Sequence, residues 1–377
     1  MALKMKKKTL QVALFSIIFF YSGSSFSQDK NQPIKFGALL HITGEWAAQG
    51  VAFKDGASLA ESKINASGGI NGRSVKVVFE DTQYKPQIAH SGAKKLISVD
   101  MVSGVIVSTL SEIEAAGPEF ERAKIPSIVL WDSSPEIDAI GDYIFSIGPW
   151  APFSGERPAD FAIDHFKAKT AAVLYTATPW SESVAKYFEK HFKARGGTIR
   201  NVVSFNPGDG DHRSVLSKIK ASNPDIIYAP IDYEIMSFFR QLRSLKIGQP
   251  IVTSDIITED NLAEESAVLE GIYQSMVGDP DSEETKRMIA DYKDKFKRDC
   301  TQILYTAWGY DGIMLLTEAY KNALQNNISD GESIKNELYK IQNYSGASGK
   351  ISFNAKGSSP GRPSIYQIRS SKFELVE

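Results

Sequence analysis

Short apolar runs rich in β-branched residues alternate with longer amphipathic runs along this chain, and this pattern restricts its fold more than any other feature. In the first half we expect strands at residues 34–40, 75–80, 102–107 and 125–130, separated by helices at 52–66, 86–98 and 112–123. Such alternation is typical of a doubly wound parallel sheet, because each helix carries the chain back across the sheet. A glycine pair at 68–69 ends the first of these helices, and Pro86 suits the first turn of the second.

The same pattern then begins again. A helix is expected to end near residue 166, and the alternation continues with strands at 170–175, 202–205, 226–229 and 250–253 and helices at 182–195, 213–221 and 235–245. Two α/β units of similar length predict two similar lobes, joined near residues 148–152. Beyond residue 280 the sequence favours helices at 283–296, 306–326 and 333–341 and strands at 349–353 and 364–369.

The first 27 residues have the three parts of a secretory signal peptide. A basic head with lysines at 4, 6, 7 and 8 precedes an apolar run at 10–21 and small residues up to Ser27. The apolar run has about a dozen residues, too few to cross a hydrocarbon core of about 30 Å as a helix. We therefore expect cleavage before Gln28 and a periplasmic protein; an uncleaved anchor is the alternative. No cysteine lies near this junction, which argues against a lipoprotein.

Composition and motifs argue against several classes of function. The chain has 43 basic and 45 acidic residues, and loss of the four signal-peptide lysines leaves 39 basic residues and a net charge near −6, which gives no footprint for nucleic acid. Cys300 is the only cysteine and the five histidines are scattered, so neither a disulfide nor a metal site is expected. There is no Gly-x-Ser-x-Gly elbow and no phosphate-binding glycine loop. We expect no cofactor and no enzymatic activity.

Three segments carry a resemblance to a known family. They are Ile-Asn-Ala-Ser-Gly-Gly-Ile-Asn-Gly-Arg at 64–73, Asn-Pro-Asp-Ile-Ile-Tyr at 223–228 and Tyr-Thr-Ala-Trp-Gly-Tyr-Asp at 305–311. With them the chain resembles, over essentially its whole mature length, the periplasmic leucine/isoleucine/valine-binding proteins of ABC transporters. The resemblance implies a type I periplasmic binding fold: two doubly wound parallel-sheet lobes, joined by three crossover segments, that close like a clamp. We expect lobe 1 to hold residues 28–149 and 278–355, and lobe 2 residues 150–277 and 356–377.

Ligands of open α/β sheets bind beyond the carboxyl ends of the strands, and polar loops follow two strands of the expected first lobe. Ser108 and Thr109 lie between a strand and a helix, where N–H groups and hydroxyls suit a carboxylate. The resemblance implies that they hold the ligand's carboxylate; a plain N-cap role is the alternative. It also implies a carboxylate contact at Ser133, and the neighbouring Asp132 could offer its backbone carbonyl.

In the expected second lobe, the resemblance implies that an acidic residue binds the ligand's ammonium group. That position falls on Asp255, and a buried cation needs such a partner. Asp232 lies near another site that contacts the ligand in the family, with a helix N-cap before Ile235 as the alternative. If both aspartates face the cleft, the ligand should carry more positive charge or more donors than leucine.

Three tryptophans fall at positions that the resemblance places in the cleft. They are Trp46, Trp131 and Trp180, and together they suggest a wall for an apolar or planar group, with ordinary packing as the alternative.

The resemblance implies an extracytoplasmic solute-binding protein of an ABC importer. It would capture an amino acid or a related small polar or aromatic ligand and deliver it to an ABC permease in the inner membrane, acting as a monomer. Two other classes stay open: a sensor of the same fold that presents its ligand to a signalling receptor, and a secreted hydrolase, suggested only by carboxylates and hydroxyls in the cleft loops.

Overall fold

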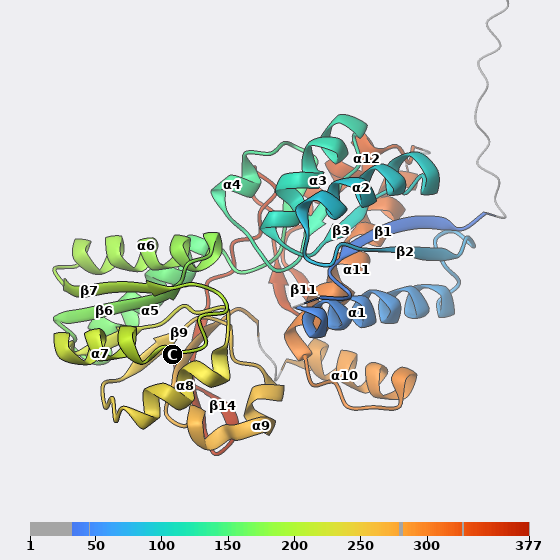
Figure 1. Ribbon diagram of the computed structural model, residues 1–377. Helices are drawn as coiled ribbons and strands as arrows, with labels where there is room; N and C mark the ends of the chain where they lie inside the picture. The colour runs from blue at the N-terminus through green and yellow to red at the C-terminus, as the bar shows by residue number, and fades with distance from the viewer. Residues whose placement is uncertain (1–31, 45, 279–281, 326–327, 377) are drawn as a thin grey trace, which may run out of the picture.

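The computed structural model describes residues 32–44, 46–278, 282–325 and 328–376. The expected signal peptide, residues 1–27, lies outside the described residues. Within them, no helix has the length and apolar character needed to span a membrane. The described chain forms two α/β lobes, each built on one large sheet (Figure 1).

The first lobe is built on a five-stranded parallel sheet in the order β2-β1-β3-β4-β5. Its strands are β1 (Ile34–Leu40), β2 (Val75–Asp81), β3 (Val105–Val107), β4 (Ser127–Val129) and β5 (Ile144–Ser146). The early helices of this lobe are α1 (Ala47–Ala66), α2 (Pro86–Lys95), the π-helical turn η1 (Leu96–Asp100), α3 (Leu110–Ala123) and α4 (Pro135–Asp138).

The chain returns to the first lobe near its end. It adds α10 (Glu283–Phe296), α11 (Ile303–Gln325), α12 (Gly331–Tyr339) and a hairpin of β11 (Tyr344–Gly346) and β12 (Gly349–Ile351). Figure 1 shows these late, orange helices beside the blue N-terminal elements.

The second lobe is built on a seven-stranded sheet in the order β14-β13-β10-β9-β8-β6-β7. Its strands are β6 (Thr170–Thr176), β7 (Thr198–Phe205), β8 (Ile226–Tyr228), β9 (Ile251–Thr253), β10 (Tyr273–Met276), β13 (Ser364–Arg369) and β14 (Lys372–Leu375). Its helices are α5 (Ala151–Asp164), α6 (Pro179–Ala194), α7 (Arg213–Ser222), α8 (Ile235–Ser244) and α9 (Glu259–Leu269). The five strands from β6 to β10 are parallel. β13 extends the sheet by pairing antiparallel with β10, and β14 pairs antiparallel with β13.

The chain passes between the lobes three times, between β5 and α5, between β10 and α10, and between β12 and β13. Two parallel-sheet lobes with three crossovers are the fold class expected from the sequence. The lobe bounds at 149/150, 277/278 and 355/356 remain our proposal, and they assign every strand to the sheet in which it pairs.

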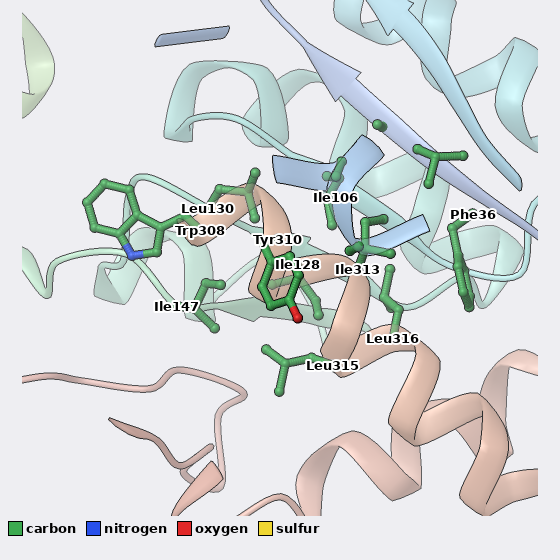
Figure 2. Packing of buried hydrophobic residues seen from close by; sticks show 14 of the residues in the cluster. Phe36, Ile106, Ile128, Leu130, Ile147, Trp308, Tyr310, Ile313, Leu315 and Leu316 are labelled. Carbon is green, nitrogen blue, oxygen red and sulfur yellow. The ribbon is translucent and has the colours of Figure 1, made fainter. Parts of the chain in front are cut away.

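Helix α11 is the centre of the first lobe's core. Figure 2 shows Trp308, Ile313 and Leu316 of this helix in one buried cluster with Ile106, Ile128 and Leu130. On another face α11 approaches α1 closely: a Cβ added at Gly56 would lie 2.0 Å from the Thr306 oxygen, and one at Gly309 would lie 2.1 Å from the Phe53 oxygen. Glycine at both positions therefore permits this close contact between the two helices.

Most differences from the sequence-based expectations concern short elements. Helix α1 begins at Ala47 rather than at residue 52, and the expected helix at 86–98 is α2 followed by the π-helical turn. The sequence did not predict α4, β5, α9, β10, β11 or β14. Five of them, all except α9, have only three or four residues, and α9 is acidic and interrupted by non-helical backbone at Glu265. In these elements neither the helical nor the strand period of hydrophobic residues runs long enough to be recognised.

Candidate functional site

A pocket lies where loops of both lobes meet, and it encloses about 510 Å³ of empty space, its open mouth included. Its lining consists of Trp46, Tyr84, Thr109, Trp131, Asp132, Trp180, Asp232, Ile235, Asp255, Ile256 and Tyr305. Most of these residues follow the carboxyl end of a parallel strand, because the chain leaves the sheet there in every strand–loop–helix unit. Thr109 follows β3, Asp132 follows β4, and Asp255 follows β9.

Six of the eight site residues predicted from the sequence line this one pocket: Trp46, Thr109, Asp132, Trp180, Asp232 and Asp255. An adjoining cavity shares Asp255 and Tyr305 with it and is otherwise lined largely by apolar side chains such as Met276 and Leu304. The adjoining cavity contains only one of the predicted residues, Asp255, so the pocket with six of them is the stronger candidate.

The N-terminus of α3 binds carboxylates of the protein itself. Thr109 is the N-cap, and its backbone N–H donates to the Glu112 carboxylate at 3.1 Å. The next backbone N–H, that of Leu110, donates to Oδ2 of Asp132 at 2.6 Å. The Asp132 carboxylate thus occupies this helix end, and a contact of its backbone carbonyl with a ligand stays a prediction. Burial raises the pKa of Asp132 to about 6, and the Leu110 N–H opposes that rise.

Two predicted serines do not line the pocket. Ser108 is fully buried, and its hydroxyl donates to the Leu39 carbonyl oxygen at 3.3 Å. The Ser133 hydroxyl lies 2.7 Å from that of Ser146, which lies 3.0 Å from that of Ser358. Both serines therefore pack into the structure behind the loops, where the neighbouring residues Thr109 and Asp132 are the ones that reach the pocket.

Asp255 is the most deeply buried carboxylate of the pocket, with 7% of the residue exposed. Its Oδ2 atom has no hydrogen-bond partner among the residues that the structure describes. Burial raises the pKa of Asp255 to about 7; the Asp132 carboxylate adds to the rise, and hydrogen bonding from its own backbone and from Trp131 opposes it.

Asp232 faces the same space from the loop after β8. Its Oδ2 accepts the Thr178 hydroxyl at 2.5 Å, and its own N–H donates to the Thr176 hydroxyl at 3.1 Å. Its Oδ1 is buried and makes no hydrogen bond of normal geometry within the described ranges. Burial raises the pKa of Asp232, and the hydroxyls of Thr178, Thr176 and Ser181 oppose that rise. The alternative role as N-cap of α8 does not hold, because Glu234 occupies that position.

Aromatic rings form much of the remaining wall. Trp131 packs edge-on against Trp46 with ring centroids 5.6 Å apart, and against Tyr305 at 5.0 Å. Trp46 also reaches Tyr233 of the second lobe at 5.5 Å. The sequence did not single out Tyr84 or Tyr305 for the site, although Tyr305 lies in the 305–311 segment that carries the resemblance and Tyr84 follows a predicted strand.

Within the described residues, no group of three or more His, Cys, Asp or Glu side chains has the arrangement of a metal site. The Cys300 thiol lies 3.5 Å from the Thr306 hydroxyl, and burial raises the pKa of this thiol.

A family model described as periplasmic binding protein matches residues 33–371 of this chain. A protein named Leu/Ile/Val-binding protein homolog 1 from Brucella abortus is 24% identical over 366 residues, which cover 93% of each chain. Among solved structures, the branched-chain amino acid transporter substrate binding protein LivJ from Streptococcus pneumoniae, in complex with isoleucine, is 27% identical, with a TM-score of 0.81 over 92% of this chain and 99% of its own. An ABC transporter solute binding protein from Rhodopseudomonas palustris, in complex with benzoate, shares the fold at 19% identity, with a TM-score of 0.78 over 91% of this chain and 95% of its own.

Proposed function

This chain belongs to the periplasmic binding protein family, and we propose that it is the solute-binding protein of an ABC importer, which captures an amino acid or a related small polar or aromatic solute in the pocket between its lobes. The observation that carries this proposal is the two-sided lining of the pocket. Thr109, Trp131 and Asp132 come from the first lobe, and Trp180, Asp232 and Asp255 come from the second. A solute in contact with both walls stabilises the closed arrangement, because only there are all contacts made at once.

The relatives support the same role. LivJ holds isoleucine in its crystal structure, and the Brucella protein is named for leucine, isoleucine and valine. We propose further that this protein acts in the periplasm as a monomer, reaches it through the signal peptide at 1–27, and hands its solute to an ABC permease without chemical change.

The test is a panel of amino acids, amines, amides and aromatic acids, screened by thermal unfolding of the mature chain and then by calorimetry. A ligand at 100 times its Kd should add about 2.7 kcal/mol to the free energy of unfolding. Asp255→Ala should abolish the response to a cationic solute, whereas Asp211→Ala, which removes an exposed aspartate paired with Arg213, should preserve it. A panel in which no solute changes the melting temperature would contradict the proposed function, as would product formation from a bound solute.

A further inference from the structure

The charged groups of the pocket are all of one sign. Asp132, Asp232 and Asp255 line it, and no lysine, arginine or histidine belongs to its lining in the described part of the chain. A carboxylate that enters such a site meets three acidic side chains and no cationic side chain of the described lining. It does so in a region of low dielectric, where opposite charge is needed to replace lost hydration. The pocket therefore disfavours anionic groups as a whole.

Two N–H groups at the N-terminus of α3, a feature suited to an anion, are already occupied. The N–H groups of Thr109 and Leu110 at the start of α3 donate to Glu112 and Asp132. A ligand carboxylate at this helix end would have to displace the Asp132 carboxylate, which would then remain beside it without its N–H partner. Leu110 donates at 2.6 Å, so this internal contact is short and well formed.

The opposite wall offers carboxylate oxygens that lack donors. Oδ2 of Asp255 and Oδ1 of Asp232 are buried and make no hydrogen bond of normal geometry with residues of the described ranges. Asp255 is 7% exposed and lines the pocket. Buried polar atoms are almost always hydrogen-bonded, so each of these oxygens is a position where a ligand donor belongs. Their chemistry calls for N–H groups, and best for charged ones.

The aromatic wall suits a cation as well. Trp46, Trp131 and Trp180 line the pocket together with Tyr84 and Tyr305. The faces of tryptophan and tyrosine rings attract ammonium and guanidinium groups, and the attraction grows when water is excluded. The same rings bury an apolar or planar body, which gives the ligand an apolar part next to its charge.

We infer, on the basis of the proposed function, that the solute is a small organic cation with N–H donors, such as a primary amine, an amidine or a guanidine, that carries no free carboxylate. Its N–H groups donate to Asp255 and Asp232, and its body lies against the tryptophans. The protein would thus select the decarboxylated counterparts of amino acids over the amino acids themselves.

The test compares sets of probes that share one side chain and differ only in charge. One set is 3-methylbutylamine, leucine and 4-methylpentanoate; a second is 2-phenylethylamine, phenylalanine, 3-phenylpropionate and 3-phenylpropionamide; a third is benzamidine and benzoate. We expect calorimetry to show that the cation of at least one set binds at least about tenfold more tightly than its amino acid, the range for one charged hydrogen bond, and that its acid does not bind. If the amino acid, the acid or the amide binds as tightly as the cation, the charge assignment is overturned while the proposed function stands. If no probe and no member of the wider panel binds, the result contradicts both the charge assignment and the proposed function.

A variant of Asp255 tests whether this aspartate causes the preference for cations over amino acids. Asp255→Asn keeps the size of the side chain and removes its charge, so cation affinity should fall at least about tenfold. The matched change at the surface, Asp211→Asn, should leave the affinity unchanged. Undiminished cation binding in Asp255→Asn, with a normal melting curve, would overturn the role of this aspartate. The comparison of probes on the unaltered protein decides the inference even if the variant does not fold.

Discussion

The carboxylate of Asp132 accepts a hydrogen bond from the backbone N–H of Leu110 at 2.6 Å, and so fills the N-terminus of α3 from within the protein. Replacing Asp132 by alanine opens this helix end and removes one negative charge from the pocket. We expect Asp132→Ala to gain affinity for carboxylate ligands such as leucine and isoleucine, and to lose about 1 kcal/mol of stability, as when an N-cap side chain that accepts from a helix N–H is removed. Calorimetry with leucine and urea unfolding measure the two effects.

Asp132→Asn is the matched control for this prediction. The amide oxygen can still accept from Leu110 while the charge is gone, so the gain in leucine affinity should be smaller than in the alanine variant. Equal leucine affinity in the wild type and in Asp132→Ala would show that the filled helix end does not decide which ligand binds.

The stability of the ligand-free protein should fall as the pH rises from about 4 to about 7. Burial raises the pKa of Asp255 from 3.8 to about 7, so the folded state holds a proton that the unfolded chain releases above pH 3.8. Each such proton lowers the free energy of unfolding by about 1.4 kcal/mol per pH unit inside that window. Asp132, Tyr228 and Tyr305 interact electrostatically with this carboxyl.

Melting temperatures of wild type and Asp255→Asn from pH 4 to pH 8 test the sign of this dependence. The variant cannot ionise at this position, so its curve should be flatter and should lie above that of the wild type at pH 8. If the melting temperatures of wild type and variant changed with pH in the same way, this would contradict a raised pKa at Asp255. For a cationic ligand, the affinity of the wild type should rise over the same pH range, because the charged carboxylate is the form that binds.

Trp46 connects the two lobes through its contact with Tyr233, and it also packs against Trp131. Trp46→Ala removes the ring from the pocket wall and the contact between the lobes, so ligand affinity should fall by about tenfold, mainly through faster dissociation. Trp46→Phe keeps a ring and should lose less. Stopped-flow tryptophan fluorescence measures the dissociation rate, and the idea fails if the alanine and phenylalanine variants release ligand at the wild-type rate.

The sequence could predict which loops line the candidate pocket, because parallel strands bring their carboxyl ends to one edge of the sheet. It could not predict which residue of each loop faces the pocket. Side chains of an extended segment alternate in direction, so Ser108 turns to the Leu39 carbonyl while Thr109 reaches the pocket, and Ser133 turns to Ser146 while Asp132 reaches it. A register error of one residue is enough to exchange the two.

The fold was predictable where the hydrophobic period persisted over many residues. The predicted helix at 283–296 coincides with α10, and the predicted strand at 364–369 coincides with β13. β5, with three residues, offers no period to read and is defined by its pairing with β4. Pairing partners far apart in the sequence decide such elements, and a single sequence does not reveal them.

Asp311 holds the β11–β12 hairpin against α11. Its carboxylate accepts from the backbone N–H groups of Ala347 and Ser348 at 3.0 and 2.7 Å and from the Ser348 hydroxyl at 2.5 Å. Asp311→Ala leaves these buried donors without an acceptor and should cost about 2–4 kcal/mol in urea unfolding. Asp330→Ala, which removes the N-cap contact of α12 to Ser333, should cost only about 1 kcal/mol. A loss at Asp311 no larger than that at Asp330 would contradict this account.

The last prediction concerns the contact between α1 and α11. In an exposed helix, replacing glycine by alanine stabilises the protein by up to about 1 kcal/mol, because alanine loses less conformational entropy. At Gly309 the added Cβ would lie 2.1 Å from the Phe53 carbonyl oxygen, a backbone atom that cannot move aside alone. Gly309→Ala should therefore destabilise the protein by about 1–3 kcal/mol or more, since the helices must separate. Gly248→Ala is the control, because nothing lies within 4 Å of its Cβ position, and it should stay within about 1 kcal/mol of wild type. Urea unfolding of both variants decides the matter: equal stabilities would mean that the close approach of the two helices does not depend on glycine.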